Sequence, residues 1–428
     1  MKNCNRKWGL QVVELINNKK LLRILYIVTM TLAFTTRYGD LEIGFTIQIF
    51  IGLFWIILGV LKFKDNGYCF NGKNDKQLPK FIFLYMLPHV VIQVYTIVLM
   101  LFGKVDWGYF TTNLTVYVPT LLAIVAIYLI GTNVYWYTFL ALFLSWCLSV
   151  VISLICKGPA IFTHAIIQAY INPLDQTGGL SINYLELHDL VLAIGYLLIY
   201  YLFTNHKLEK KEKIILIFTI VIMILGMKRV SVLGLIFVLI FYFILKKVPS
   251  EKQFKVCFIL GVTIFVLSYL FIYVLSDGNI FYDVISDLGI NVMGRNYYYQ
   301  AIMKYATFSP GFIGIGRNVV TKILNSELSY LNVGGVHSDI IKMYVENGFI
   351  LFGLWLWYQL IFMLKFYKKE YGDNVAILYF GFLIYLFTLY LTDNVEVYFI
   401  CQILVTMLPI TYALKQKGNN CREFERIN

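Results

Sequence analysis

The sequence predicts an all-α polytopic integral membrane protein, and three observations lead to that class. Hydrophobic residues make up 59% of the 428 and charged residues only 14%, whereas soluble domains carry about 25% charged residues. The mean hydropathy is +0.72. The apolar residues also gather into runs close to the roughly 20 residues that cross a bilayer as a helix. This composition excludes a soluble globular protein, a disordered chain and a small disulfide-stapled module.

About 12 apolar runs are expected to form transmembrane helices. They lie at 21–36, 43–61, 81–102, 113–130, 135–156, 189–204, 214–227, 230–245, 256–275, 349–364, 374–391 and 396–414. The first run follows Lys19 and Lys20 and has no small-residue cleavage site, so we interpret it as a signal anchor. The seven cysteines form no CxxC pair. The sequence therefore predicts neither a disulfide framework nor a zinc site, and no metal or cofactor is expected.

The basic residues predict the orientation of these helices. With a cytoplasmic N-terminus, 26 of the 36 Lys and Arg residues fall on the inner side, which carries a net charge of +16 against −4 outside. The positive-inside rule then places both termini in the cytoplasm. Topology and contact with anionic lipid explain the Lys-rich loops, so a nucleic-acid partner is not expected.

Two neighbouring runs, 214–227 and 230–245, are separated only by Lys228 and Arg229. The connections before and after this pair are both Lys-rich, so both are expected on the cytoplasmic side. An even number of crossings must lie between them. The sequence therefore predicts a tight hairpin with Lys228 and Arg229 at its outer tip.

Two outer connections are long, at 157–188 and 276–348. Long loops in compact proteins are usually functional or disordered. These two contain aromatic and apolar residues throughout, so we expect them to fold against the membrane surface. The larger one, between the ninth and tenth predicted helices, is expected to contain short helices. The whole chain, 1–428, is expected to form a single transmembrane domain.

Within the larger loop, a short helix is predicted from about Asp339 to Glu346. Ser338 or Asp339 is suited to cap its start, and Asn347-Gly348 to stop it. Asp339, Lys342 and Glu346 fall on one face, since their spacing is three and four residues.

His337 stands at the N-terminal mouth of this helix. Free backbone N–H groups and the helix dipole favour anions there. A histidine beside an anion site, at the water edge of a membrane, suits the removal of a proton from a hydroxyl group.

Residues 336–348, VHSDIIKMYVENG, resemble the His-led motif of bacterial polysaccharide polymerases of the Wzy type and of the related O-antigen ligases. Other elements occur in the same order as in that family. They are the LELHD run at 185–189, the hairpin tip at 228–229, Gly294-Arg295, the glycine-rich turn at 311–316 and the LTDN run at 391–394. The resemblance covers about residues 185–395 in motifs and the whole chain in topology.

The resemblance implies a GT-C-like fold and an inverting, metal-independent glycosyltransferase in the cytoplasmic membrane. Such an enzyme joins lipid-linked oligosaccharide repeat units on the outer face. The donor is a growing glycan on undecaprenyl diphosphate, and the acceptor is a repeat unit on the same type of lipid. Membrane lipids, a chain-length regulator and a flippase of the same pathway are the further partners implied.

Roles for individual residues follow from this chemistry. His337 would remove the proton from the acceptor hydroxyl. Guanidinium groups bind phosphate oxygens in bidentate fashion, which suits a diphosphate leaving group. The candidates for diphosphate binding are Arg229, Arg295, Arg317 and Lys228. The candidates for contact with sugars or acceptor are Glu186, His188, Tyr297, Tyr298, Asp339 and Glu346.

Simpler interpretations stay open for these residues. His337 would then only cap or pack, and Arg229 would anchor a hairpin at lipid head groups. Arg295 and Arg317 share their loop with several aspartates and would be paired structurally. The tyrosines would belong to the interfacial aromatic belt, and Glu186 and His188 would merely precede or begin the sixth predicted helix.

Two other functions stay open. An O-antigen ligase uses the same motifs and hands finished glycan to another acceptor. A lipid-linked oligosaccharide flippase also predicts about 12 spans, but transporters usually show repeat symmetry and polar residues at the bilayer midplane. Here the ionisable residues gather in the outer segments, which favours an outer active site.

Overall fold

A computed structural model describes most of the chain. The described residues are 18–35, 44–66, 69–70, 73–74, 77–109, 114–171, 188–204, 210–225, 229–277, 295–326 and 335–427. They are helical apart from turns and two short antiparallel strands, β1 (Cys69–Phe70) and β2 (Lys73–Asn74). The chain divides into two compact units. Unit 1 comprises residues 1–83, 114–231 and 398–428, and unit 2 comprises 84–113 and 232–397.

Unit 1 is a bundle of apolar helices. Its helices are α2 (Lys19–Phe34), α3 (Gly44–Asn66), α5 (Leu114–Ile130), α6 (Val134–Lys157), α7 (Pro159–Ile171), α9 (His188–Thr204), α10 (Lys210–Leu225) and α19 (Phe399–Ile427). Helix α5 packs against α3 and α19, and α2 packs against α6. A buried hydrogen bond of 2.8 Å between the hydroxyls of Tyr26 and Thr138 joins α2 to α6.

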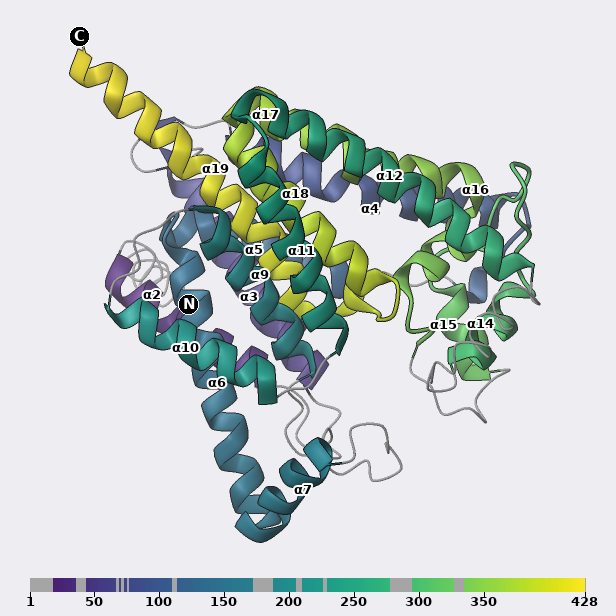
Figure 1. The fold of residues 1–428 in the computed structure, drawn as a ribbon, viewed down its shortest axis with the longest axis horizontal. Helices are drawn as coiled ribbons and strands as arrows, with labels where there is room; N and C mark the ends of the chain where they lie inside the picture. The colour runs from purple at the N-terminus through teal and green to yellow at the C-terminus, as the bar shows by residue number, and fades with distance from the viewer. Residues whose placement is uncertain are drawn as a thin grey trace, which may run out of the picture. The chain divides into compact units, whose positions relative to one another are not determined.

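Unit 2 contains His337 and the buried charged residues Arg317 and Glu396. It holds residues 84–101 of α4 (Gln77–Leu101), most of α11 (Arg229–Lys247), and then η1 (Trp107–Tyr109), α12 (Ser250–Ser276), α14 (Arg295–Met303), α15 (Val319–Ser326), α16 (Asp339–Trp357), the π-helical turn η4 (Tyr358–Phe362), α17 (Met363–Tyr371), α18 (Asp373–Tyr390) and η5 (Val395–Val397). Figure 1 shows α14 and α15 beside the end of α12 and the start of α16.

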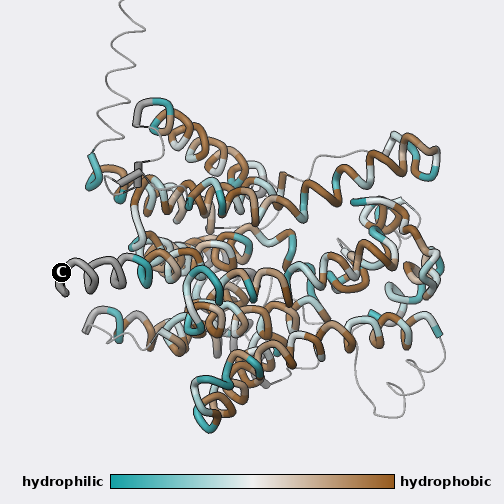
Figure 2. The backbone as a smooth tube through the Cα atoms, turned by 90° about the horizontal axis from the view of Figure 1, so that it is seen from above, coloured by the Kyte–Doolittle hydropathy of each residue, from teal (hydrophilic) through white to brown (hydrophobic). Residues whose placement is uncertain are grey.

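Helix α18 is the central helix of unit 2. Of its most apolar stretch, 83% of the residues are buried inside the protein, against 22% for α12. The side chains that α12 leaves exposed are largely apolar, such as Ile259, Val266 and Leu270. An apolar exposed surface of this kind matches a lipid environment. Figure 2 shows the hydropathy along the chain, with largely hydrophobic helices and hydrophilic residues near many of their ends.

The structure bears out an α-helical membrane protein. Among the described residues, eight helices are long and apolar enough to cross a bilayer. They are α3, α4, α6, α11, α12, the continuous α16–η4–α17, α18 and α19, while α5 and the Leu190–Thr204 part of α9 are apolar but shorter. Helices α2 and α10 coincide with the remaining two predicted runs. Each predicted run is therefore a helix, and the count of about 12 spans stays a prediction.

The structure has the helix stop that the sequence predicts at Asn347-Gly348. Element α16 covers both the predicted short helix and the start of the span predicted from 349, and a break at Gly348 separates the two. Gly348 has the non-helical angles φ 76° and ψ 177°. Residues 312–316 lie alongside the break and form hydrogen bonds with it. Phe349 N donates to Phe312 O (2.8 Å), and Ile315 N donates to Val345 O (3.0 Å).

Replacing Gly348 by alanine is expected to lower the melting temperature of the purified protein strongly. The positive φ costs an L-residue about 1–2 kcal/mol, and the new Cβ would lie 2.3 Å from the Ile313 carbonyl carbon. Gly372 is the matched control, because its φ is 93° but nothing lies within 4 Å of an added Cβ. A melting temperature for Gly348→Ala no lower than that for Gly372→Ala would show that the close approach at the break is unimportant.

Candidate functional site

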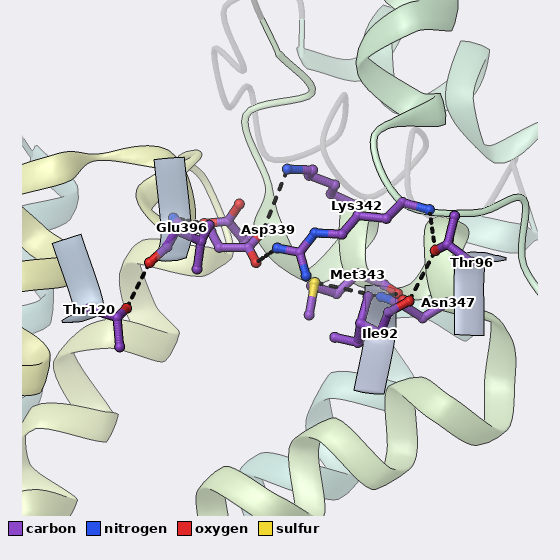
Figure 3. A network of polar contacts seen from close by, with 10 residues as sticks. Ile92, Thr96, Thr120, Asp339, Lys342, Met343, Asn347 and Glu396 are labelled. Atoms are coloured by element: carbon purple, nitrogen blue, oxygen red, sulfur yellow. Dashed lines mark hydrogen bonds and ion pairs between the residues drawn. The ribbon is translucent and has the colours of Figure 1, made fainter. Parts of the chain in front are cut away.

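Five buried charged side chains of unit 2 interact with one another. Figure 3 labels three of them, Asp339, Lys342 and Glu396. Asp339, Lys342 and Glu346 come from α16, Arg317 precedes α15, and Glu396 comes from η5. Arg317 Nη2 lies 2.7 Å from Glu396 Oε1, and Lys342 Nζ lies 3.5 Å from Glu396 Oε2. The Arg317 and Glu396 side chains are only 2% and 5% exposed. Glu396 therefore pairs with both buried cations, and we call these five residues the charge network.

The α16 spacing explains why three members of the network meet. Asp339, Lys342 and Glu346 are three and four residues apart, which puts them on one face of the helix. Ser338 caps the helix as predicted, since its hydroxyl accepts a hydrogen bond from Ile341 N at 3.4 Å. Asp339 Oδ2 then accepts a hydrogen bond from Glu396 N at 2.8 Å, which joins η5 to the start of α16.

Arg317 directly follows residues 312–316, which form hydrogen bonds alongside the break in α16. Gly316 N donates to Glu346 O at 2.9 Å, and Gly314 approaches Gly348 so closely that a Cβ at residue 314 would lie 2.5 Å from Gly348 N. Arg317 N donates to the hydroxyl of Thr96 on α4 at 3.0 Å. These bonds hold the glycine-rich turn so that the Arg317 side chain is buried inside unit 2.

Glu396 is ionised at neutral pH. Burial by itself raises the pKa of a carboxyl group. Arg317 and Lys342 outweigh burial and lower the pKa of Glu396 to about 2 from its usual 4.5. The charged groups around Glu396 therefore come from the turn at Arg317 and from α16.

Two carboxylate oxygens of the network lack partners among the described residues. Asp339 Oδ1 and Glu346 Oε1 are buried and accept no hydrogen bond from the described part of the chain. A buried polar atom without a partner is costly, and such atoms in a stable protein usually have a reason. Both side chains lie inside unit 2 rather than on its surface.

His337 lies at the surface beside this buried region. It has φ +52°, an uncommon value for a residue other than glycine. Its side chain is 35% exposed, and Nδ1 lies 3.9 Å from Oδ1 of the buried Asp393. The ring of Tyr298 is centred 6.5 Å from the imidazole. The histidine is thus open to solvent on one side and faces a carboxylate and an aromatic ring on others.

Six other predicted site residues lie in unit 2 with His337. Tyr298 is half-buried and near the imidazole, and Tyr297 is 63% exposed. Arg295 begins α14, one helical turn before Tyr298. Asp339, Glu346 and Arg317 lie in the charge network. Because Arg317 pairs with Glu396 inside the protein, binding a diphosphate through it would require this pair to open.

The remaining predicted residues belong to unit 1 or lie outside the described residues. Arg229 begins α11 with its side chain exposed and belongs to unit 1. His188 begins α9, but its side chain is outside the described residues, and so are Glu186 and Lys228. Their assigned roles stay predictions from the sequence.

Asp393 and Glu396 are site residues for which no role was predicted from the sequence. Both are buried acids at the N-terminal side of a long apolar helix, α19. Ionisable residues next to or within apolar spans are functional candidates by default, and that signal would have drawn attention to them.

The helices and the buried charge network define a polytopic α-helical membrane protein. Comparison of the chain with protein-family models, curated protein sequences and solved structures finds no match.

Proposed function

We propose that the protein is an inverting membrane glycosyltransferase that polymerises lipid-linked oligosaccharide repeat units at the outer face of the cytoplasmic membrane. The observation that carries this proposal is the surroundings of His337. An imidazole that is partly exposed, faces a buried carboxylate at 3.9 Å and lies beside an aromatic ring has the features of a general base.

His337 accepts the proton of the acceptor hydroxyl as its oxygen attacks the anomeric carbon of the donor. The bond from that carbon to the diphosphate breaks, and its electron pair leaves with the diphosphate. The attack comes from the opposite side, so the anomeric configuration inverts. Asp393 favours the imidazolium that forms, because an opposite charge stabilises it. The proton is then released to water through the exposed side of the ring.

Arg295 is the described residue best placed to bind the departing diphosphate. It begins α14 within one turn of Tyr298, whose ring faces His337. At the first turn of a helix, free backbone N–H groups add to the guanidinium in attracting phosphate oxygens. Arg229 and Lys228 keep the same assignment from the sequence alone.

The tyrosines and the buried acids have different proposed roles in contact with the sugars. Tyr297 is exposed and suits stacking against a sugar ring, and the ring of the next residue, Tyr298, is centred 6.5 Å from that of His337. Asp339 and Glu346 are buried, so they reach an acceptor sugar only if the network opens. Without such opening, Asp339 holds η5 against the start of α16 by accepting the hydrogen bond from Glu396 N.

Purified full-length protein in proteoliposomes is expected to convert a synthetic polyprenyl-diphosphate repeat unit into dimers and longer products, even with a chelator present. Mass spectrometry of the lipid-linked products measures this directly. Transfer of the glycan only to an acceptor without a diphosphate lipid would identify a ligase instead. Movement of the substrate across the bilayer with no new glycosidic bond would identify a flippase and end the proposal.

A further inference from the structure

Three consecutive tyrosines begin near the N-terminus of α14, and they occupy three different environments. Tyr297 is 63% exposed, Tyr298 is half-buried beside His337, and Tyr299 is 4% exposed. An α-helix turns by about 100° per residue, so three neighbours cannot all face the same way. The proposed function uses Tyr297 and Tyr298 and leaves Tyr299 without a role.

The Tyr299 hydroxyl lies between the two segments that carry the acid–base pair. It is 3.1 Å from the carbonyl oxygen of His337 and 3.4 Å from that of Leu391. Both acceptors are backbone carbonyls, so the hydroxyl is the donor and shares one proton between them. The first carbonyl belongs to His337 itself, and the second lies two residues before Asp393.

The His337 backbone needs such support. Its φ of +52° is one that residues with a Cβ adopt rarely, and it persists only where the surroundings hold it. Neighbouring bonds fix the residues that follow: Ser338 Oγ donates to Tyr390 O at 3.1 Å, and Glu396 N donates to Asp339 Oδ2 at 2.8 Å. The Tyr299 bond acts on the strained residue itself.

We propose that Tyr299 is a positioning residue, whose hydroxyl holds the His337 turn against the 391–393 turn so that the imidazole stays beside Asp393. The importance of this for catalysis rests on the function proposed above. The positioning itself does not, because it fixes where the imidazole lies in the protein without substrate. The two claims are therefore measured separately.

The test compares Tyr299→Phe with the matched control Tyr358→Phe. Each change removes one tyrosine hydroxyl that donates to a backbone carbonyl in unit 2, and the Tyr358 hydroxyl donates to Leu84 O at 2.8 Å. The first readout is the rate at which diethyl pyrocarbonate modifies His337, mapped by mass spectrometry on full-length protein in lipid nanodiscs. His164 on α7, which is exposed, provides an internal reference. The second readout is kcat and KM for polymerisation.

Tyr299→Phe is expected to raise the modification rate of His337 relative to His164 by about fivefold, the equilibrium equivalent of one net hydrogen bond. In the same variant kcat should fall by a similar factor while KM stays unchanged. Tyr358→Phe should leave the relative rate and kcat as they are in the unsubstituted protein.

Two results would overturn the proposal. One is an unchanged His337 modification rate in Tyr299→Phe. The other is an equal rise in both variants, which would mean that losing any such hydroxyl loosens the protein. If Tyr299→Phe alone raises the rate but the unsubstituted protein forms no glycosidic bond, the positioning role stands and the polymerase proposal fails.

Discussion

Replacing His337 by asparagine is expected to lower the polymerisation rate by about 100- to 10,000-fold, the usual effect of losing a general base. Asparagine is the sharpest substitution, because it tolerates positive φ better than other residues with a side chain. It therefore keeps the backbone at +52° while removing the proton acceptor. Alanine would abolish activity as well, but it would add backbone strain and confuse the interpretation.

The control for this prediction is His164→Asn on α7, an exposed histidine in unit 1 that should be dispensable. Polymer length and initial rate are measured in the same proteoliposome assay, with melting temperatures to confirm equal folding. Asp393→Asn should reduce the rate less than His337→Asn, since it removes only the charge that favours the imidazolium. Full-length polymer made by folded His337→Asn protein would reject the general-base assignment.

The helices of this protein could be predicted from the sequence because a bilayer requires long apolar runs. Each of the twelve runs coincides with a helix. The short helix that starts at Asp339 is also present, and the break at Gly348 separates it from the apolar run that starts at 349. The difference lies in burial. An outer loop was expected to carry Asp339, Lys342 and Glu346, whereas in the structure their side chains are buried within unit 2.

The site was predictable only where its residues are close in sequence. The shared face of α16, the Ser338 cap and the break at Gly348 follow from spacing and local preference. The partners of those residues do not. Arg317 pairs with Glu396 across 79 positions and bonds to Thr96 across 221. No local pattern encodes such pairings, because they depend on how distant helices pack.

The tyrosine triplet illustrates the same limit. The sequence indicated an aromatic segment near a candidate histidine, and Tyr298 does lie beside His337. Which of the three tyrosines faces outward and which is buried depends on the rotation of α14 against α16. Because only packing fixes that rotation, the different roles of Tyr297 and Tyr299 could not be assigned before the structure was known.

The second large effect is expected for Glu396→Gln, which should destabilise the protein by about 3–5 kcal/mol, the usual result of removing one partner from a buried ion pair. Glu396 contacts both buried cations, at 2.7 Å from Arg317 and 3.5 Å from Lys342. The amide has nearly the same shape as the carboxylate but no charge, so the loss is electrostatic. The melting temperature in detergent and resistance to denaturant both measure it.

Glu346→Gln is the matched control, since Glu346 is equally buried and has the same chemistry. Among the described residues no ion pair within 4.0 Å involves Glu346, and its Oε1 accepts no hydrogen bond. Replacing that carboxyl group by an amide should therefore cost much less. Equal destabilisation by both variants would show that the total charge of the network, rather than the pairing at Glu396, sets its stability.

The pH dependence of the difference adds an independent check. The pKa of Glu396 is lowered to about 2 in the folded protein, so its contribution is fully present above the usual value of 4.5 and is lost as the pH falls towards 2. The stability gap between the unsubstituted protein and Glu396→Gln should accordingly be largest at neutral pH and shrink below pH 4.5. If the difference in stability between the two proteins stays constant as the pH falls to about 2, then Glu396 stabilises unit 2 by its shape and not by its charge.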